Sequence, residues 1–166
     1  MLSSALKVLQ ISWAYLNLTA VATAAVREAK AGLDFCQEVY EKTEQKIWIV
    51  AELEEARLSA QGVILGCPGS YDLVCDLGGS SLELAEINNG EVGQSLTSHL
   101  GTFMLKGIEG GSAVREDLVK TTMKKLSIEM GPQQNQVFLF GGAWRALARV
   151  DMMRVNYPPL VLHEFR

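Results

Sequence analysis

Three consecutive strand-like runs, joined by two glycine-containing turns, constrain the fold of this chain more than any other feature. The runs cover residues 72–77, 82–87 and 91–98. Gly78-Gly79-Ser80 joins the first run to the second, and Asn88-Asn89-Gly90 joins the second to the third with an Asn-Gly pair, a strong hairpin signal. The spacing therefore predicts a three-stranded antiparallel meander.

Helix and strand periodicities alternate through the rest of the chain. Before the meander, the pattern predicts helices over residues 3–15 and 52–65, a helix from an N-cap at Asp34 to about Thr43, and short strands over residues 18–23 and 46–50. Residues 27–32 are expected to form a loop or turn. After the meander, the pattern predicts helices over residues 102–107, 112–130 and 144–150, and a strand over residues 136–140. This order is that of an α/β protein.

A loop signal at residues 67–70 marks the predicted domain boundary. Its sequence, Cys67-Pro68-Gly69-Ser70, breaks both the helical and the strand periodicity. The residues before it alternate strand and helix, whereas the residues after it begin with the meander. We therefore expect two domains, one over residues 1–67 and one over residues 68–166.

The charge balance limits the partners of the chain. It has 15 Lys and Arg against 19 Asp and Glu, a formal net charge of −4, whereas a general nucleic-acid binder normally carries a basic stripe. Lys120, Lys124 and Lys125 are interpreted as a solvated helix face. We therefore expect no nucleic-acid partner, and a polyanionic ligand would have to be held by local donors and a metal ion.

Cysteine usage and hydropathy indicate the compartment. The three cysteines form no CxxC pair and the chain has two histidines, so we expect reduced thiols and no structural zinc site. No apolar stretch approaches the roughly 18 uninterrupted residues of a membrane span. These features predict a cytoplasmic protein without a membrane span.

The stretch from Asp76 to Glu83 is the strongest candidate for chemistry. The two glycines that follow a strand ending in Asp let backbone N–H groups approach a phosphate, because no Cβ blocks the approach. Asp76 and Glu83 would lie at the mouth of the same hairpin, and carboxylate oxygens suit Mg²⁺ better than zinc. The alternative is an ordinary glycine β-turn in which Asp76 is a turn former.

Two further clusters have both a functional and a structural interpretation. The helix dipole favours acids in a first turn, which explains Glu52, Glu54 and Glu55, but one of them could serve as a general base that orients water for attack on phosphorus. Arg27 follows a predicted buried strand. It could contact phosphate with its guanidinium, or lie solvated in a loop.

Four blocks of the sequence, taken in order, resemble the exopolyphosphatase / guanosine pentaphosphate phosphatase (Ppx/GppA) family. They are AVATAAVREAKAGLDF at residues 20–35, AELEEARLSAQGV at 51–63, LVCDLGGSSLEL at 73–84 and LFGGAWRALARV at 139–150. Together they cover most of the chain, so the match is more specific than any single motif. The last block and Tyr157-Pro158-Pro159 are similar to alphaproteobacterial members.

The resemblance implies an actin-like (sugar kinase/Hsp70/actin) fold with two ribonuclease-H-like domains, the second complete and the first partial in this chain. Family members remove the terminal phosphate of inorganic polyphosphate or of guanosine pentaphosphate, usually with Mg²⁺. The family's catalytic glutamate, directly before Ala-Arg, falls on Glu55. Its metal-binding acids fall on Asp76 and Glu83. Its phosphate-binding positions fall on Arg27, Gly78, Gly79 and Ser80.

The chain departs from the family pattern in several places. Ala51-Glu52 replaces the usual Ser-Gly, so we expect a less mobile loop before Glu55. Ser80 replaces a third glycine, and Leu82 replaces a threonine, which removes one hydroxyl from the site. The Asp-x-Gly-Ser-Asn-Ser hairpin of the first domain and the C-terminal helical domain of longer members are not found. We therefore expect a chain that is truncated at both ends and has little or no turnover alone.

A partial first domain is expected to expose a sheet edge and apolar surface, which favours a homo-oligomer formed through that edge. Two alternatives remain open. One is an actin-like or sugar-kinase-type ATP-binding domain, in which Asp-x-Gly-Gly also contacts phosphate. The other is a non-catalytic remnant that binds another chain. The glutamate block before Ala56-Arg57 favours the phosphatase.

Overall fold

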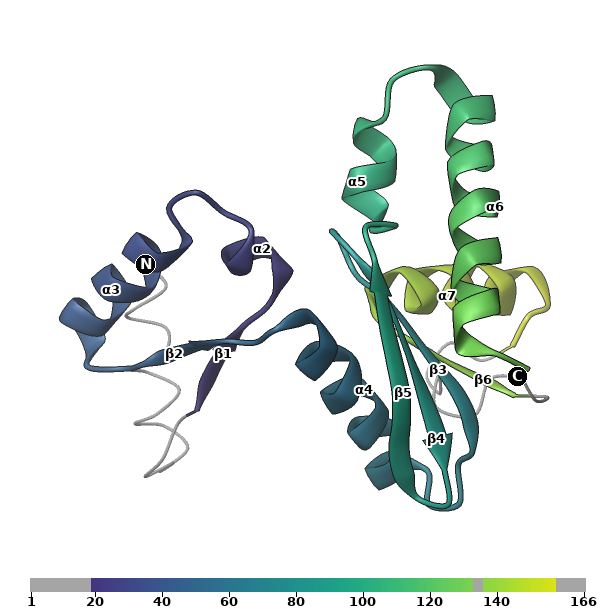
Figure 1. Cartoon of the computed structure of the whole chain (residues 1–166), viewed down its shortest axis with the longest axis horizontal. Coiled ribbons are helices and arrows are strands. Elements are labelled where there is room, and N and C mark those ends of the chain that lie inside the picture. Colours follow the sequence, from purple (N-terminus) through teal and green to yellow (C-terminus); the bar gives the residue numbers. More distant parts are fainter. Residues whose placement is uncertain (1–18, 133–135, 158–166) are drawn as a thin grey trace. The chain divides into compact units, whose positions relative to one another are not determined.

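The computed structural model describes residues 19–132 and 136–157. The chain divides into two compact units, the first ending at Ala51 and the second beginning at Glu52 (Figure 1). Each unit is described by itself. The helix expected over residues 3–15 lies outside the described residues.

The first unit is built on a parallel pair of short strands with helices in the connection between them. Its elements in chain order are β1 (Ala20–Ala22), α2 (Ala24–Arg27), α3 (Gly32–Thr43) and β2 (Ile47–Ile49). Val21 lies opposite Trp48 in the register, and their exposed fractions are 60% and 56%. This exposed pair is part of the apolar surface that the sequence predicts, while the homo-oligomer stays a prediction.

The start of α3 differs from the sequence prediction. Asp34 was expected to be the N-cap, but the helix begins at Gly32, with Ala31 in the cap position and Asp34 inside the first turn. Gly32 allows this because its backbone passes the α2 end so closely that a Cβ would lie 2.0 Å from the carbonyl oxygen of Val26. A tertiary contact therefore overrides the local capping preference of Asp34.

The second unit contains the predicted meander in a four-stranded sheet. The strands are β3 (Asp72–Leu77), β4 (Leu82–Asn88), β5 (Glu91–Ser98) and β6 (Val137–Phe140), in the order β5-β4-β3-β6. The first three pair antiparallel as expected, and β6 adds parallel to β3. The β4–β5 turn has positive φ at Asn89 and Gly90, at 52° and 78°, as a tight Asn-Gly hairpin requires.

Helices cover both faces of this sheet (Figure 1). On one face, α4 (Glu52–Gly66) packs Ala56 and Ala60 against a core that includes Val74, Ala85 and Ile87. The other face holds a second core with α5 (Thr102–Gly107), α6 (Gly111–Met130) and α7 (Gly142–Arg154). In Figure 1, α5 leads away from the sheet and α6 returns to it. Strand alternation sends neighbouring side chains of β3 into different cores.

The compact units divide before α4, earlier than the loop at residues 67–70 that the sequence marks as the domain boundary. The reason is packing, since α4 contacts β3, β4 and β5. Assignment of the two parts to two ribonuclease-H-like domains stays a prediction. In the part of the chain that the structure describes, no helix has the length and hydropathy needed to cross a membrane. All three cysteines are free thiols, as expected.

The close approach of α4 predicts opposite effects of two substitutions that are two residues apart on this helix. Ala60 is 0% exposed, so Ala60→Leu overfills the interface and should lower the free energy of unfolding by about 1–3 kcal/mol. Gly62 has nothing within 4 Å of an added Cβ, so Gly62→Ala should raise it by about 0.5–1 kcal/mol. Hydrogen exchange of the β4 amides measures both effects, and equal effects of the two substitutions would contradict this packing.

Candidate functional site

The glycine turn between β3 and β4 is a tight turn that is closed by a backbone hydrogen bond. Leu77 and Leu82 are register partners, and the N–H of Gly78 donates to the carbonyl of Ser81 at 3.0 Å. Gly78, Gly79 and Ser80 are all half-buried. The sequence prediction of a tight glycine turn here is confirmed.

Backbone N–H groups at the start of α5 donate hydrogen bonds to the carbonyl groups of this turn. The N–H of Thr102 donates to the oxygen of Gly78 at 3.1 Å, that of Phe103 to Gly79 at 2.8 Å, and that of Gly101 to Ser80 at 3.2 Å. No described peptide bond is cis. In a trans peptide, a carbonyl and the next N–H point in opposite directions. The N–H groups of Gly79 and Ser80 therefore point away from α5, and within the described residues neither donates a hydrogen bond.

A glycine that sequence reasoning missed makes this docking possible. A Cβ on Gly101 would lie 2.1 Å from the carbonyl carbon of Ser80 and 2.2 Å from the carbonyl oxygen of Gly79. These are backbone atoms, so a side chain at this position has to push the turn and α5 apart. The only sequence signal was a glycine directly before a predicted helix.

Asp76 and Glu83 lie side by side at the base of the turn. They are register partners in adjacent strands, so their side chains share one face of the sheet. Asp76 alternates with Val74, which packs under α4, so this face is the α4 face. Glu83 is 2% exposed, whereas Asp76 is half-buried. The structure thus brings together the two predicted metal ligands.

Two neighbours fix the surroundings of the Asp76 carboxylate. The hydroxyl of Ser59, on α4, donates to Oδ2 at 2.7 Å. On the β6 side, Gly141 approaches so closely that a Cβ there would lie 2.8 Å from Oδ1 and 2.7 Å from the carbonyl oxygen of Leu77. Neither Ser59 nor Gly141 was a sequence candidate.

The glutamates at the start of α4 have different partners. Arg57 forms a two-pronged ion pair with Glu54, with distances of 2.7 and 2.5 Å, and these hydrogen bonds lower the pKa of the Glu54 carboxyl. Glu55 lies one helical turn before Ser59, and residues four apart share a helix face. Glu55 is therefore on the same side of α4 as the hydroxyl that contacts Asp76, while its catalytic role stays a prediction.

Arg27 belongs to the first unit, at the last position of α2. Its Nη1 donates to the carbonyl oxygen of Val50 at 2.7 Å, so the guanidinium lies at the carboxyl end of β2. The side chain is half-buried. It is thus anchored to backbone and is not a freely solvated loop arginine.

A buried thiol lies directly behind the site. Cys75 points into the core opposite α4, and Trp144 of α7 packs against the same cluster. Burial, which is the larger cause, and the nearby charge of Asp76 raise the pKa of the Cys75 thiol to about 11. The thiol is therefore protonated at neutral pH.

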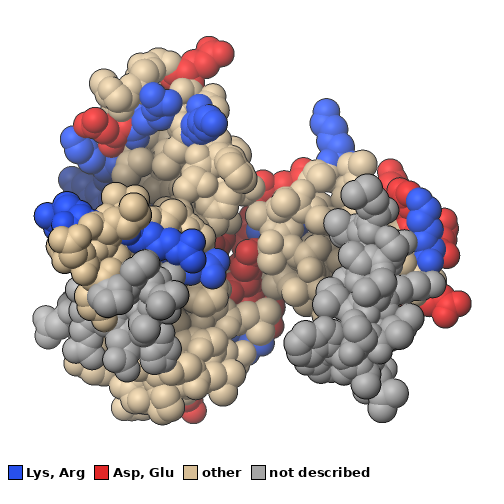
Figure 2. Space-filling model, turned by 180° about the vertical axis from the view of Figure 1, so that it is seen from behind, with Lys and Arg blue, Asp and Glu red and all other residues tan. Residues whose placement is uncertain are grey.

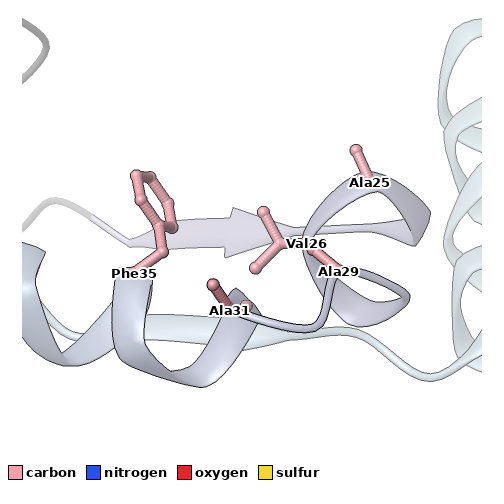
Figure 3. A pocket seen from close by; sticks show the side chains of 6 residues that line it. Ala25, Val26, Ala29, Ala31 and Phe35 are labelled. Atoms are coloured by element: carbon pink, nitrogen blue, oxygen red, sulfur yellow. The ribbon is translucent and has the colours of Figure 1, made fainter.

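Two other surface features do not have the character of a phosphate site. A pocket of about 290 Å³ in the first unit is lined by apolar groups and backbone only (Figure 3): Ala25, Val26, Ala29, Ala31, Gly32 and Phe35. Figure 2 shows basic and acidic side chains next to each other on the helical part of the second unit. Lys120 pairs with Glu116 at 3.8 Å and Lys125 with Glu129 at 3.7 Å, which fits a solvated helix face.

The carboxylate oxygens of Asp76 and Glu83 are suitable ligands for Mg²⁺. Mg²⁺ is commonly held by one or two carboxylates, with phosphate oxygens and water completing the shell. Asp76 and Glu83 provide two carboxylates, and one oxygen of Asp76 is already used by Ser59. Over residues 19–132 and 136–157, no group of three or more His, Cys, Asp or Glu gathers as a metal site. A cation here would therefore depend on its phosphate ligand.

Comparison with known proteins gives one family. The model of the Ppx/GppA phosphatase family matches residues 2–165. No protein among the curated sequences matches the chain.

Solved structures show the fold. A Ppx/GppA family member from Aquifex aeolicus is 21% identical, with a TM-score of 0.76 over 95% of this chain and 53% of its own. An exopolyphosphatase from Cytophaga hutchinsonii is 18% identical, with a TM-score of 0.77 over 93% of this chain and 53% of its own. The chain thus spans about half the length of these structures. Its fold is the actin-like α/β fold that the family resemblance implies.

Gly101 provides a direct test of the docked turn. Gly101→Ala places a methyl group against the backbone of the turn and should lower the free energy of unfolding by about 1–3 kcal/mol. Gly107→Ala, at the other end of α5, has open space for its Cβ and serves as the matched control. Urea unfolding of both variants measures the difference. If the two variants were equally stable, α5 would not be docked as described.

Cys75 predicts a specific loss of stability in alkali. The folded thiol has a raised pKa, so its contribution is complete below pH 9.0, the ordinary value, and is lost as pH rises toward about 11. This loss should be of the order of 2 kcal/mol. Cys75→Ala removes the group that titrates, so its free energy of unfolding should fall less between pH 9 and 11. Parallel pH curves for the variant and the parent chain would refute the assignment.

Proposed function

The chain belongs to the Ppx/GppA phosphatase family, and on this premise we propose that it takes part in hydrolysing the terminal phosphate of inorganic polyphosphate or guanosine pentaphosphate. One observation carries the proposal: the turn at residues 78–80 has its carbonyls bound by α5 and its N–H groups pointing away. Backbone N–H groups in such a turn form a cradle for phosphate oxygens. The acidic pair Asp76 and Glu83 lies at the base of that cradle.

Each proposed residue has a role that follows from its chemistry. Gly79 and Ser80 donate N–H groups to phosphate oxygens, and Gly78 keeps the turn tight through its bond to Ser81. Asp76 and Glu83 would hold Mg²⁺, directly or through water. When bound, the ion neutralises charge on the phosphate oxygens in the transition state. Arg27 is proposed as a further phosphate ligand of the intact site.

Glu55 is the proposed general base. Its position in the first turn of α4 keeps a negative charge favourable there, because the helix N-terminus is positive. The neighbouring Glu54 forms an ion pair with Arg57, whereas Glu55 lies on the helix face of Ser59, whose hydroxyl donates to Asp76. Phosphoryl transfer needs mostly positioning and charge stabilisation. We therefore propose that this chain contributes a base and a cradle of N–H groups to the site.

Activity measurements with a matched pair of variants test the proposal. We expect Mg²⁺-dependent release of phosphate from polyphosphate and from guanosine pentaphosphate to be weak for this chain alone, and whatever release is measured should fall about 10²–10⁴-fold in Glu55→Gln, the usual contribution of a general base. Glu54→Gln removes the adjacent carboxylate and its ion pair with Arg57, and should retain most of the activity.

Two results would contradict this function. Equal losses in Glu54→Gln and Glu55→Gln would remove the assignment of the base. Tight binding of ATP in calorimetry, with no binding of polyphosphate, would favour the ATP-binding alternative.

A further inference from the structure

The hydrogen bond between Ser59 and Asp76 connects two parts of the proposed site that are 17 residues apart in the chain. Ser59 lies on α4, one turn after Glu55, whereas Asp76 is the second-last residue of β3, just before the glycine turn. The bond is 2.7 Å long and partly buried. It is a charge-assisted bond, which is stronger and more directional than one between neutral groups.

The backbone geometry around this bond is set by small residues. Ala56 and Ala60, at 1% and 0% exposure, bring α4 close to the sheet, and Ser59 precedes Ala60 on the same helix. Because the helix backbone lies so near β3, the short side chain of a serine is sufficient to reach Oδ2 of Asp76. The contact is therefore produced by the packing that builds the core.

The opposite side of the carboxylate is limited by Gly141. Gly141 has no side chain, and a Cβ at this position would lie 2.8 Å from Oδ1 of Asp76. Asp76 is thus held between the Ser59 hydroxyl and the turn that leads from β6 into α7. With Oδ2 committed to Ser59, Oδ1 is the oxygen left for a ligand, next to the carboxyl ends of β3 and β6.

We propose that Ser59 is a positioning residue, which keeps the Asp76 carboxylate in one orientation so that Oδ1 can meet a phosphate-bound cation. This rests on the proposed function, in which Asp76 is a metal ligand. The hydroxyl also ties the helix that carries Glu55 to the strand that carries the phosphate turn. Groups that orient a metal ligand in this way typically change metal affinity about 10–100-fold when removed.

The test uses three variants of the whole chain. Ser59→Ala removes the hydroxyl but keeps a good helix former, Ser59→Thr keeps the hydroxyl, and Ser112→Ala removes an exposed hydroxyl from α6 as a control. The first measurement is the set of three-bond couplings between Hα and Hβ of Asp76, which report its χ1 rotamer without any ligand. The second is calorimetric titration with Mg²⁺ in the presence of tripolyphosphate.

In Ser59→Ala, we expect the Asp76 couplings to move toward the average of several rotamers and the Mg²⁺ affinity to fall about 10-fold or more. Ser59→Thr and Ser112→Ala should keep the couplings and affinity of the parent chain. A merely structural serine would not change the rotamer of Asp76 selectively.

The outcomes separate this inference from the proposed function. Unchanged couplings in Ser59→Ala would overturn the positioning role, whatever the metal does. Averaged couplings in Ser59→Ala, together with no Mg²⁺ binding by the parent chain, would support the orienting bond and refute the metal site of the proposed function.

Discussion

The hydrogen bonds from the start of α5 to the glycine turn are the constraint on which the candidate site depends. Three successive carbonyls, from Gly78 to Ser80, each accept a backbone N–H. Because every peptide here is trans, binding the carbonyls on one side fixes the N–H groups of Gly79 and Ser80 on the other. The anion-binding character of the turn thus comes from tertiary docking of a neighbouring helix, and Gly101 makes that docking sterically possible.

The core and the site share the same packing. Ala56 and Ala60 let α4 approach the sheet closely, which places Ser59 at Asp76 and puts Glu55 on the same helix face. Antiparallel register then sets Glu83 beside Asp76. The end of the β3–β4 pair, inside the sheet, therefore carries a cradle of N–H groups and a pair of carboxylates, and the adjoining α4 carries a candidate base.

The sequence predicted the parts of this arrangement that depend on local signals. Both turns of the meander were predictable because their residues, Gly78-Gly79 and Asn89-Gly90, favour tight turns. The meander and its Asp76–Glu83 pairing follow from the spacing between these turns. Contacts between distant segments were not predictable. Ser59 meets Asp76 only because α4 folds onto this sheet, and periodicity does not say which sheet an amphipathic helix covers. Asp34 was wrongly assigned as a cap because the close approach of Gly32 to α2 decides where α3 begins.

The most direct test of the central claim is an NMR titration of the isotope-labelled chain with tripolyphosphate and Mg²⁺, followed at the backbone amides. The account predicts that the amides of Gly79 and Ser80 shift downfield and saturate, because they donate to phosphate. The amides of Thr102 and Phe103, which already donate to the turn, should shift much less. Shifts confined to the exposed lysines of α6, with Gly79 and Ser80 unchanged, would contradict the claim that this turn binds phosphate.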